Sequence, residues 1–270
     1  MSTTTIVRGS SAGTRGVTVG GVLRSEWLKL VTVRSTYWTT AVALLLAAAT
    51  ALLIGVAFDD SSPGAGGAFA VVGATGSLSF VALVVGVLGV LAIGGEYATL
   101  QIRSSYTAVP ARWPALVAKA VVVGAWSFVL GLVVTFGSYG IIAALFGGKG
   151  IEVPFDGEVV GALIGGATYL AIIGVFAVGL GALVRASAGG ITILTAVLFV
   201  LPIVLSLVAA LTRAEWASNA GSYLLSSAGG ALFAAGDPSS IALWAALLAL
   251  AGWLAAVWVP ALLLTQTRDV

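Results

Sequence analysis

Residues 159–184 read VVGALIGGATYLAIIGVFAVGLGALV and contain no charged side chain. The stretch is bounded by Glu158 and Arg185, and its only polar side chains are one Thr and one Tyr. A helix needs about 20 apolar residues to cross about 30 Å of hydrocarbon, so this stretch is long enough to span a membrane. We therefore expect a transmembrane helix here.

Five other uncharged stretches of the chain are also long enough to hold a span. The composition agrees, because 60% of the residues are apolar and only 8% are charged, against about 45–50% and about 25% in soluble domains. The sequence thus predicts an all-α integral membrane protein with six transmembrane helices. The expected spans are 37–58, 68–94, 116–146, 159–184, 189–211 and 241–264. Residues 216–236 are too polar to span, and we expect an interfacial or re-entrant piece on the outer side.

The basic residues predict the orientation, because cytoplasmic loops of membrane proteins carry an excess of Lys and Arg. With the N-terminus inside, only Lys149 and Arg213 fall outside. The cytoplasmic basic residues are then Arg8, Arg15, Arg24, Lys29, Arg34, Arg103, Arg112, Lys119, Arg185 and Arg268. We expect a multi-pass protein of the bacterial cytoplasmic membrane with both ends in the cytoplasm. Residues 1–20 lack an apolar signal region and are interpreted as a disordered tail before one transmembrane domain at 21–270.

The absent residue types exclude several kinds of chemistry. There is no Cys and no His, so thiolate chemistry, imidazole metal ligands and histidine bases are ruled out. No ionisable residue falls in the middle of a predicted span, which disfavours ion-coupled carriers, although some carriers use backbone carbonyls at broken helices. A hydrolase without a buried acid would need a Ser–Lys pair, and Lys119 and Lys149 lie at span ends without an obvious partner.

The sequence also contains no P-loop motif with which this chain could bind ATP and power transport. The string closest to a P-loop surrounds Gly148-Lys149-Gly150, but it lacks the hydroxyl residue after the lysine and has Ala143 at the first Gly position. We therefore expect no enzymatic activity in this chain. If transport is active, a partner chain supplies the energy.

A short amphipathic pattern precedes the first span. Its apolar stripe is Leu23, Trp27, Leu30 and Val31, and its basic residues are Arg24, Lys29 and Arg34. Such a helix lies flat in the membrane interface, with the Trp ring at headgroup depth. Trp38 at the start of the first span suits the aromatic belt. We favour this interfacial helix over an ordinary positively charged flank.

The longest internal cytoplasmic segment follows the second span. From Glu96 to Tyr106 it has a short amphipathic helical pattern, which Pro110 and Pro114 close. It combines a carboxylate, two Arg and two Tyr, a mixture that suits docking to a protein more than to lipid. The pattern alone leaves a second interpretation open, in which this is a solvated loop whose Arg residues only set the topology.

These two elements together resemble a known family. Ser25-Glu26-Trp27-Leu28-Lys29-Leu30, followed by Arg34-Ser35-Thr36-Tyr37-Trp38, is similar to the N-terminus of ABC-2-type transporter permease subunits of the actinobacterial type. Gly95-Glu96-Tyr97 with Ile102-Arg103, Val109-Pro110 and Ala118-Lys119-Ala120 resembles the loop between spans two and three of the same group. The motifs cover about residues 20–120, and the later spans match by hydropathy alone.

The resemblance implies a permease subunit of an exporter. Two permeases, identical or homologous, would work with two copies of a separate ATP-binding subunit that carries ATP and Mg²⁺, and no cofactor would bind to this chain. The amphipathic N-terminal pattern would be an elbow helix on the inner leaflet of the lipid bilayer. The segment Glu96–Tyr106 would hold a coupling helix that enters a cleft on the ATP-binding subunit. Its expected contact residues are Glu96, Tyr97, Thr99, Gln101, Ile102, Arg103 and Tyr106.

The substrate would pass between the two permeases, beside spans two and five. Pro202 is expected to bend the fifth span, and the polar groups of an otherwise apolar pathway would be Tyr169, Thr195 and Ser206. A hydrophobic or amphiphilic small molecule, peptide or lipid is the expected substrate, and no nucleic-acid partner is expected. Two other classes stay open: a partner-independent carrier or channel, and a non-transporting membrane immunity or scaffold protein.

Overall fold

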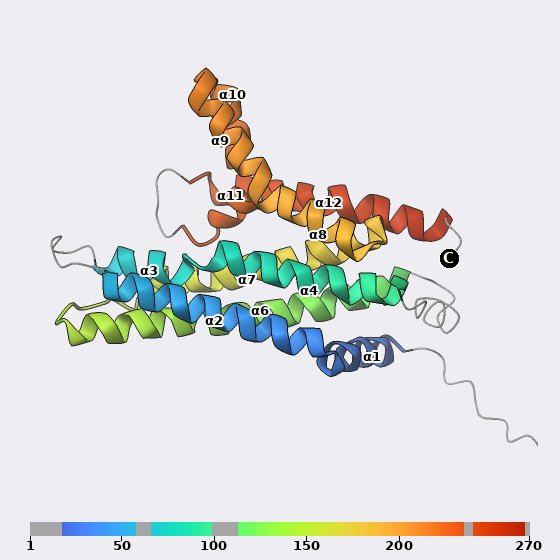
Figure 1. The fold of residues 1–270 in the computed structure, drawn as a ribbon, viewed down its shortest axis with the longest axis horizontal. Coiled ribbons are helices and arrows are strands. Elements are labelled where there is room, and N and C mark those ends of the chain that lie inside the picture. Colours follow the sequence, from blue (N-terminus) through green and yellow to red (C-terminus); the bar gives the residue numbers. More distant parts are fainter. Residues whose placement is uncertain (1–17, 58–65, 99–112, 235–239, 268–270) are drawn as a thin grey trace, which may run out of the picture.

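The computed structural model describes residues 18–57, 66–98, 113–234 and 240–267, and long helices aligned along one axis make up most of them (Figure 1). No strand occurs within these ranges. The helices in chain order are α1 (Val19–Thr32), α2 (Arg34–Ala57), α3 (Gly66–Thr75), α4 (Leu78–Ala98), α6 (Trp113–Gly148), α7 (Gly157–Val184), α8 (Ser187–Thr195), the π-helix η1 (Ala196–Val200), α9 (Leu201–Thr212), α10 (Glu215–Ser222), α11 (Leu225–Gly230) and α12 (Leu243–Thr267).

The prediction of six spans is confirmed. Six stretches are long and apolar enough to cross a membrane: Arg34–Ala57, Phe69–Tyr97, Trp113–Gly148, Gly157–Val184, Ser187–Thr212 and Leu243–Leu264. Each of them overlaps one predicted span, and the ends differ by a few residues. The fold is therefore that of a multi-pass, all-helical membrane protein.

Helix α7 forms the centre of the bundle. It packs against α4, α6 and α12, and most of its side chains are buried, whereas α2, α12 and Ser187–Thr212 bury few. Small residues allow the central helices to approach closely: a Cβ at Gly131 of α6 would lie 2.6 Å from the Cα of Ala167 of α7. Close approach through small residues is a common way for membrane helices to gain packing contacts.

The second span is interrupted, which the sequence did not indicate. Helix α3 ends at Thr75 and α4 begins at Leu78. The carbonyl of Ser77 accepts hydrogen bonds from the amides of Phe80 and Val81, both at 3.0 Å. The side chain of Ser77 is buried, and its hydroxyl has no hydrogen-bond partner.

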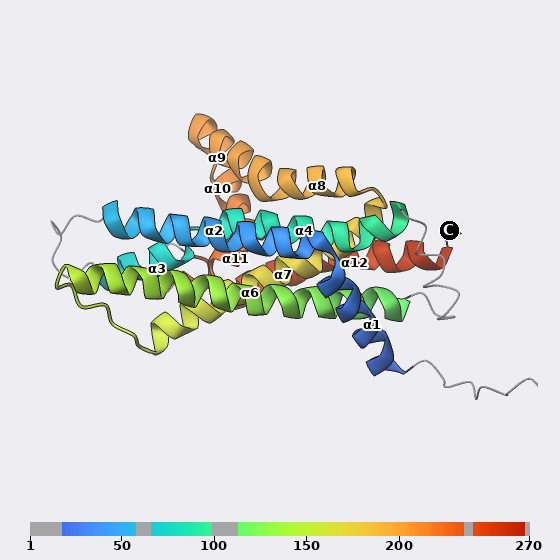
Figure 2. The ribbon, with the colours of Figure 1, turned by 60° about the horizontal axis from the view of Figure 1, so that its bottom comes forward.

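The fifth span bends where Pro202 was expected to bend it. The amide of Leu201 donates to the carbonyl of Ala196, which makes one wide π-turn directly before Pro202. Proline has no N–H to donate, and π-turns and prolines are both established causes of kinks. Beyond this point α9 leans away from the rest of the bundle (Figures 1 and 2).

The polar segment after α9 forms two short helices and does not span, as predicted. Gly229 of α11 lies against the ring of Tyr169, which is about 18 Å along α7 from the first residue of that helix. Helix α11 thus reaches well into the bundle, which favours a re-entrant piece over an interfacial one. Helix α1, the end of α4, the start of α6 and the end of α12 lie together at one end of the bundle, and α3 and the end of α6 lie at the other (Figure 1).

Candidate functional site

A side-chain hydrogen bond stabilises each end of helix α1. The hydroxyl of Thr18 accepts a hydrogen bond from the amide of Gly21 at 3.2 Å, as an N-cap residue does. Val33 is extended and ends the helix. The Thr36 hydroxyl then donates to the Leu30 carbonyl at 2.7 Å, which fixes the corner between α1 and α2.

The inward face of α1 differs in part from the predicted apolar stripe. The buried residues are Glu26 and Leu30, and Leu23 is half-buried. Trp27 lies at the margin, 43% exposed, with its ring centroid 5.8 Å from that of Trp126 on α6. Arg34 and Trp38 at the start of α2 are exposed. One side of α1 therefore packs on protein, and the proposed contact of its other side with the membrane interface stays a prediction.

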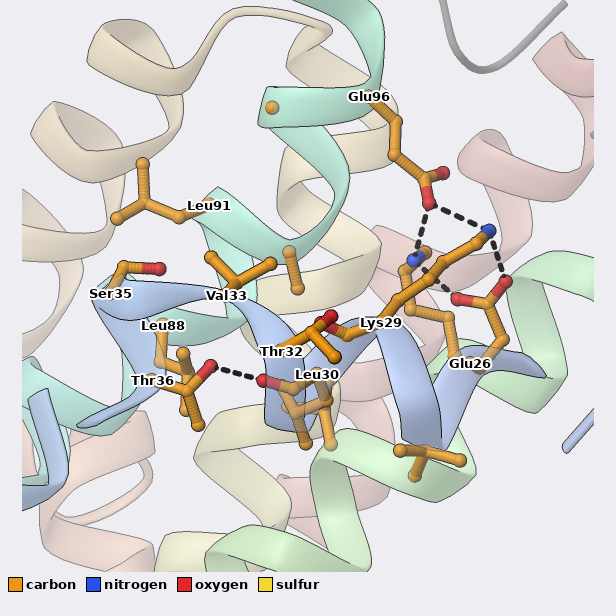
Figure 3. A pocket seen from close by; sticks show the side chains of 15 residues that line it. Glu26, Lys29, Leu30, Thr32, Val33, Ser35, Thr36, Leu88, Leu91 and Glu96 are labelled. Atoms are coloured by element: carbon orange, nitrogen blue, oxygen red, sulfur yellow. Dashed lines mark hydrogen bonds and ion pairs between the residues drawn. The ribbon is translucent and has the colours of Figure 1, made fainter. Parts of the chain in front are cut away.

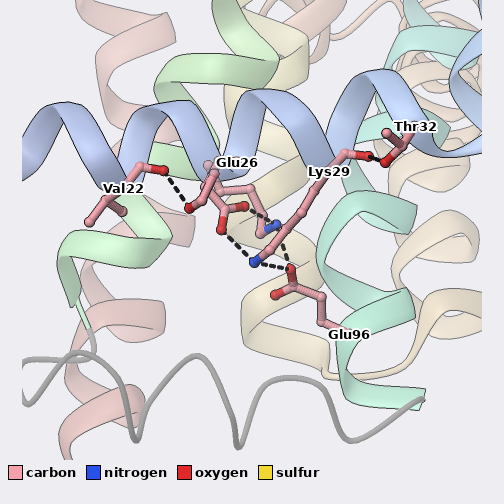
Figure 4. A network of polar contacts seen from close by, with 7 residues as sticks. Val22, Glu26, Lys29, Thr32 and Glu96 are labelled. Atoms are coloured by element: carbon pink, nitrogen blue, oxygen red, sulfur yellow. Dashed lines mark hydrogen bonds and ion pairs between the residues drawn. The ribbon is translucent and has the colours of Figure 1, made fainter. Parts of the chain in front are cut away.

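Four charged side chains from three helices meet beside α1 (Figure 4). The Lys119 ammonium of α6 lies 2.5 Å from Glu26 Oε2 and 3.0 Å from Glu96 Oε1 of α4. The Lys29 ammonium lies 2.6 Å from Glu26 Oε1 and 3.0 Å from the same Glu96 oxygen. We call Glu26, Lys29, Glu96 and Lys119 the ion cluster. It joins α1, α4 and α6, the last two of which flank residues 99–112.

The charges of the ion cluster cancel, which is the condition for burying them. The side chains of Glu26, Glu96 and Lys119 are at most 11% exposed, whereas that of Lys29 is 41% exposed. An unpaired charge at such a site would lose several kcal/mol of hydration without compensation. Burial by itself would lower the pKa of Lys29, but the hydrogen bond to Glu26 and the charge of Glu96 outweigh it and raise that pKa. Lys29 is therefore protonated at neutral pH.

The ion cluster corrects two expectations from the sequence. Lys119 was expected to have no obvious partner, and no buried acid was expected, yet Glu26 and Glu96 are buried and both bind Lys119. The partners are 93 and 23 residues away along the chain, so no local pattern reveals them. One feature of the sequence could have suggested that these acids pair with lysines. Glu26 and Glu96 are two of only three acidic residues on the predicted cytoplasmic side, which carries most of the Lys and Arg.

A pocket of about 360 Å³ adjoins the ion cluster (Figure 3). Its wall is formed by α1, the start of α2, the second half of α4 and the first turns of α6. The lining residues are Glu26, Lys29, Leu30, Thr32, Val33, Ser35, Thr36, Leu88, Leu91, Ala92, Gly95, Glu96, Lys119, Val122 and Val123.

Only part of the predicted coupling segment is described. Glu96 and Tyr97 belong to the last turn of α4, and Glu96 is engaged inside the protein by Lys29 and Lys119. Tyr97 is half-buried, and the Arg185 guanidinium lies 5.6 Å from its ring centroid. Thr99, Gln101, Ile102, Arg103 and Tyr106 lie outside the described residues, so the coupling helix stays a prediction.

The predicted pathway residues do not form one site. Pro202 and Ser206 line a groove of about 550 Å³ between α9 and the pair α10 and α11. The Thr195 hydroxyl donates to the Ile191 carbonyl of its own helix at 2.9 Å. Tyr169 is buried in the bundle against Gly229 and Phe233. The groove was not expected from the sequence, because its other wall comes from the polar segment after α9.

No protein-family model matches this chain, and no curated protein matches it either. The likeness to ABC-2-type permeases therefore rests on the quoted motifs between about residues 20 and 120, and membership of that family stays a prediction.

Proposed function

We propose that this chain is the membrane-spanning permease subunit of an ATP-binding-cassette exporter of the ABC-2 type. Separate ATP-binding subunits, two per complex, would hydrolyse ATP with Mg²⁺, and this chain would have no catalytic activity and no cofactor. The observation that carries the proposal is the ion cluster, because it links the N-terminal helix to both helices that flank the expected coupling segment.

The ion cluster supplies a physical route for coupling. A partner that pushes on residues 99–112 would move the ends of α4 and α6 together, since Lys119 and Glu96 are bonded to each other at 3.0 Å. Glu26 would transmit the same displacement to α1. Three helix ends tied by buried ion pairs respond as one unit, which is what an externally powered alternating-access cycle requires.

The fifth span offers an exposed apolar surface on which a second copy of the permease, as a further partner, would fit. Ser187–Thr212 buries few side chains in its own chain, and α9 leans away from the bundle (Figure 2). Its exposed side chains include Ile203, Val204, Leu207 and Leu211. Lipid or a second permease would cover them. The groove at Pro202 and Ser206 would then lie near the contact between copies, where a hydrophobic or amphiphilic substrate would pass.

The proposal is tested by purifying the tagged full chain in mild detergent together with the ATP-binding subunit encoded by a neighbouring gene. A stable complex with ATPase activity is expected. Arg103→Glu, in the expected coupling segment, should reduce the amount of bound subunit several-fold. Arg213→Glu is the matched control, because Arg213 is exposed and falls on the predicted outer side. Glu96 is unsuitable for this test, since a change there would also disrupt the ion cluster.

The outcome separates the remaining classes. Failure to recover a complex with any ATP-binding subunit of the host would contradict the proposal and favour a partner-independent carrier or channel, or a membrane immunity or scaffold protein. Equal loss of binding with Arg103→Glu and Arg213→Glu would contradict the placement of the contact on residues 99–112.

A further inference from the structure

The pocket beside the ion cluster has a charged end and an apolar end. Figure 3 shows Lys29 and Glu96 on one side and Leu88 and Leu91 on the other. Val122 and other aliphatic side chains complete the apolar end. A volume of about 360 Å³ falls within the range of about 300–1,000 Å³ that small-molecule sites occupy. The pocket thus has the shape and polarity for the boundary region of an amphiphile.

The depth of the pocket matches the boundary between headgroups and hydrocarbon. Helix α6 has 36 residues and is about 54 Å long, against about 30 Å of hydrocarbon. A hydrocarbon layer centred on α6 would begin about 12 Å from Trp113, while Lys119 lies about 9 Å and Val123 about 15 Å from it. The charged end therefore falls in the headgroup region and the apolar end at the edge of the acyl chains.

The charges at the polar end of the pocket favour a ligand that carries both a positive and a negative charge. Two ammonium and two carboxylate groups cancel, so a purely anionic headgroup would meet Glu26 and Glu96 as well as the lysines. Among the described residues Glu96 accepts hydrogen bonds only at Oε1, which leaves Oε2 for a donor. An ammonium group has three N–H donors, and two of those of Lys119 donate to Glu26 and Glu96.

We propose that this pocket binds a zwitterionic phospholipid of the cytoplasmic leaflet whose headgroup carries a phosphate and a primary ammonium. The ammonium donates to Glu96 Oε2, and the phosphate accepts from Lys119, whose bonds to Glu26 and Glu96 use two of its three N–H donors. The first part of an acyl chain lies on Leu88, Leu91 and Val122. The bound lipid would contact both α1 and the start of α2 and so stabilise the corner between them. This proposal does not depend on the proposed function, because it concerns the isolated chain.

Gly95 offers a way to close the pocket without touching the ion cluster. It lines the pocket and is exposed, and a Cβ added there would meet no atom within 4 Å. Gly95→Leu therefore adds a bulky aliphatic side chain at the wall of the pocket and should fold. Gly252→Leu is the matched control, because Gly252 on α12 is also exposed and also has open space at its Cβ position.

The experiment measures lipid binding to the delipidated full chain by native mass spectrometry. Three lipids with the same acyl chains are compared: phosphatidylethanolamine, phosphatidylcholine and phosphatidylglycerol. We expect one tightly bound phosphatidylethanolamine, held about ten-fold more tightly than phosphatidylcholine, whose trimethylated ammonium cannot donate a hydrogen bond to Glu96. Gly95→Leu should weaken this binding about ten-fold, whereas Gly252→Leu should leave it unchanged. Glu96→Gln also removes one charge of the ion cluster, so its readout is the ratio between lipids: the roughly ten-fold preference for phosphatidylethanolamine over phosphatidylcholine should disappear.

Three results would overturn the proposal. These are equal binding of the three lipids, preference for phosphatidylglycerol, and unchanged binding in Gly95→Leu. Glycerophosphoethanolamine, which has the same headgroup without acyl chains, should compete only at far higher concentration. Competition at a concentration similar to that of the lipid would overturn the proposal that the ligand is a lipid and would indicate a water-soluble zwitterion in its place. All variants are first compared by thermal unfolding, so that loss of binding is not read from unfolded protein.

Discussion

The Lys119 ammonium lies 2.5 Å from Glu26 Oε2, although the two residues are 93 positions apart in the chain. This ion pair closes the contact between an N-terminal helix and the first turns of α6. Because the same ammonium also binds Glu96, one lysine holds three helices together. Lys119 is therefore the residue whose loss should have the largest effect on this end of the bundle.

The first prediction concerns the stability that Lys119 provides. Lys119→Met would leave two buried carboxylates with only Lys29 to balance them, and removing one partner of a buried pair costs about 3–5 kcal/mol. We expect a decrease of that order in the free energy of unfolding in detergent. Lys149→Met at the other end of α6 is the control, because Lys149 is exposed, and it should lower the free energy of unfolding less than Lys119→Met does.

Removing both partners of the contact should restore part of the loss. Glu26→Gln combined with Lys119→Met removes the 2.5 Å ion pair and leaves Lys29 and Glu96, which lie 3.0 Å apart, as one neutral pair. We expect the double variant to be more stable than Lys119→Met alone. A double variant that is as unstable as the sum of the two singles would show that the contact contributes nothing of its own.

The second prediction concerns the titration of Lys29. Its pKa is raised in the folded protein, so its contribution to stability is complete below the ordinary lysine pKa of about 10.4 and is lost as the pH rises through the higher folded value. The difference in unfolding temperature between wild type and Lys29→Gln should therefore be constant from about pH 6 to pH 9 and should shrink in more alkaline solution. A difference that grows above this range would contradict the assignment.

Hydropathy predicted the six spans because a charge-free run of about 20 residues has few alternatives to crossing the membrane. The break at Ser77 and the inward path of α11 escaped prediction, since both depend on packing between segments distant in sequence. For the site, the amphipathic pattern placed Leu23 and Leu30 on one face. The pattern did not predict that Glu26 is buried, because a charged residue is assigned to the solvent-facing side of a helix unless its ion-pair partners are known.

The third prediction tests the close contact between α6 and α7. A Cβ at Gly131 would lie 2.6 Å from the Cα of Ala167, so Gly131→Leu must push the two helices apart. Overpacking of this kind costs about 1–3 kcal/mol. Gly137→Leu on the same helix is the control, because its Cβ would meet no atom within 4 Å. Thermal unfolding of both variants in the same detergent measures the difference, and equal stability would contradict the packing.

The fourth prediction contrasts two buried hydroxyls. Ser77 has no hydrogen-bond partner, so Ser77→Ala removes an unsatisfied group and should leave stability unchanged or raise it by about 1 kcal/mol. The Thr135 hydroxyl is shared between the Gly131 carbonyl of its own helix at 2.9 Å and the Leu163 carbonyl of α7 at 3.1 Å. Thr135→Val should cost about 0.6 kcal/mol, as the loss of an interhelical hydrogen bond in a membrane typically does. Changes of stability with the opposite signs would contradict the assigned bonding.

The fifth prediction tests the orientation in the membrane, which follows from the basic residues. The chain has no Cys, so a single introduced cysteine supplies the one thiol that a reagent can label. Gly20 and Gly148 are both exposed and have open space at their Cβ positions, and they lie at opposite ends of the bundle. In intact cells, a membrane-impermeant maleimide should label Gly148→Cys and should spare Gly20→Cys until the membrane is opened. The reverse pattern would invert the topology and place the ion cluster outside, where no ATP-binding subunit has access to α4 and α6.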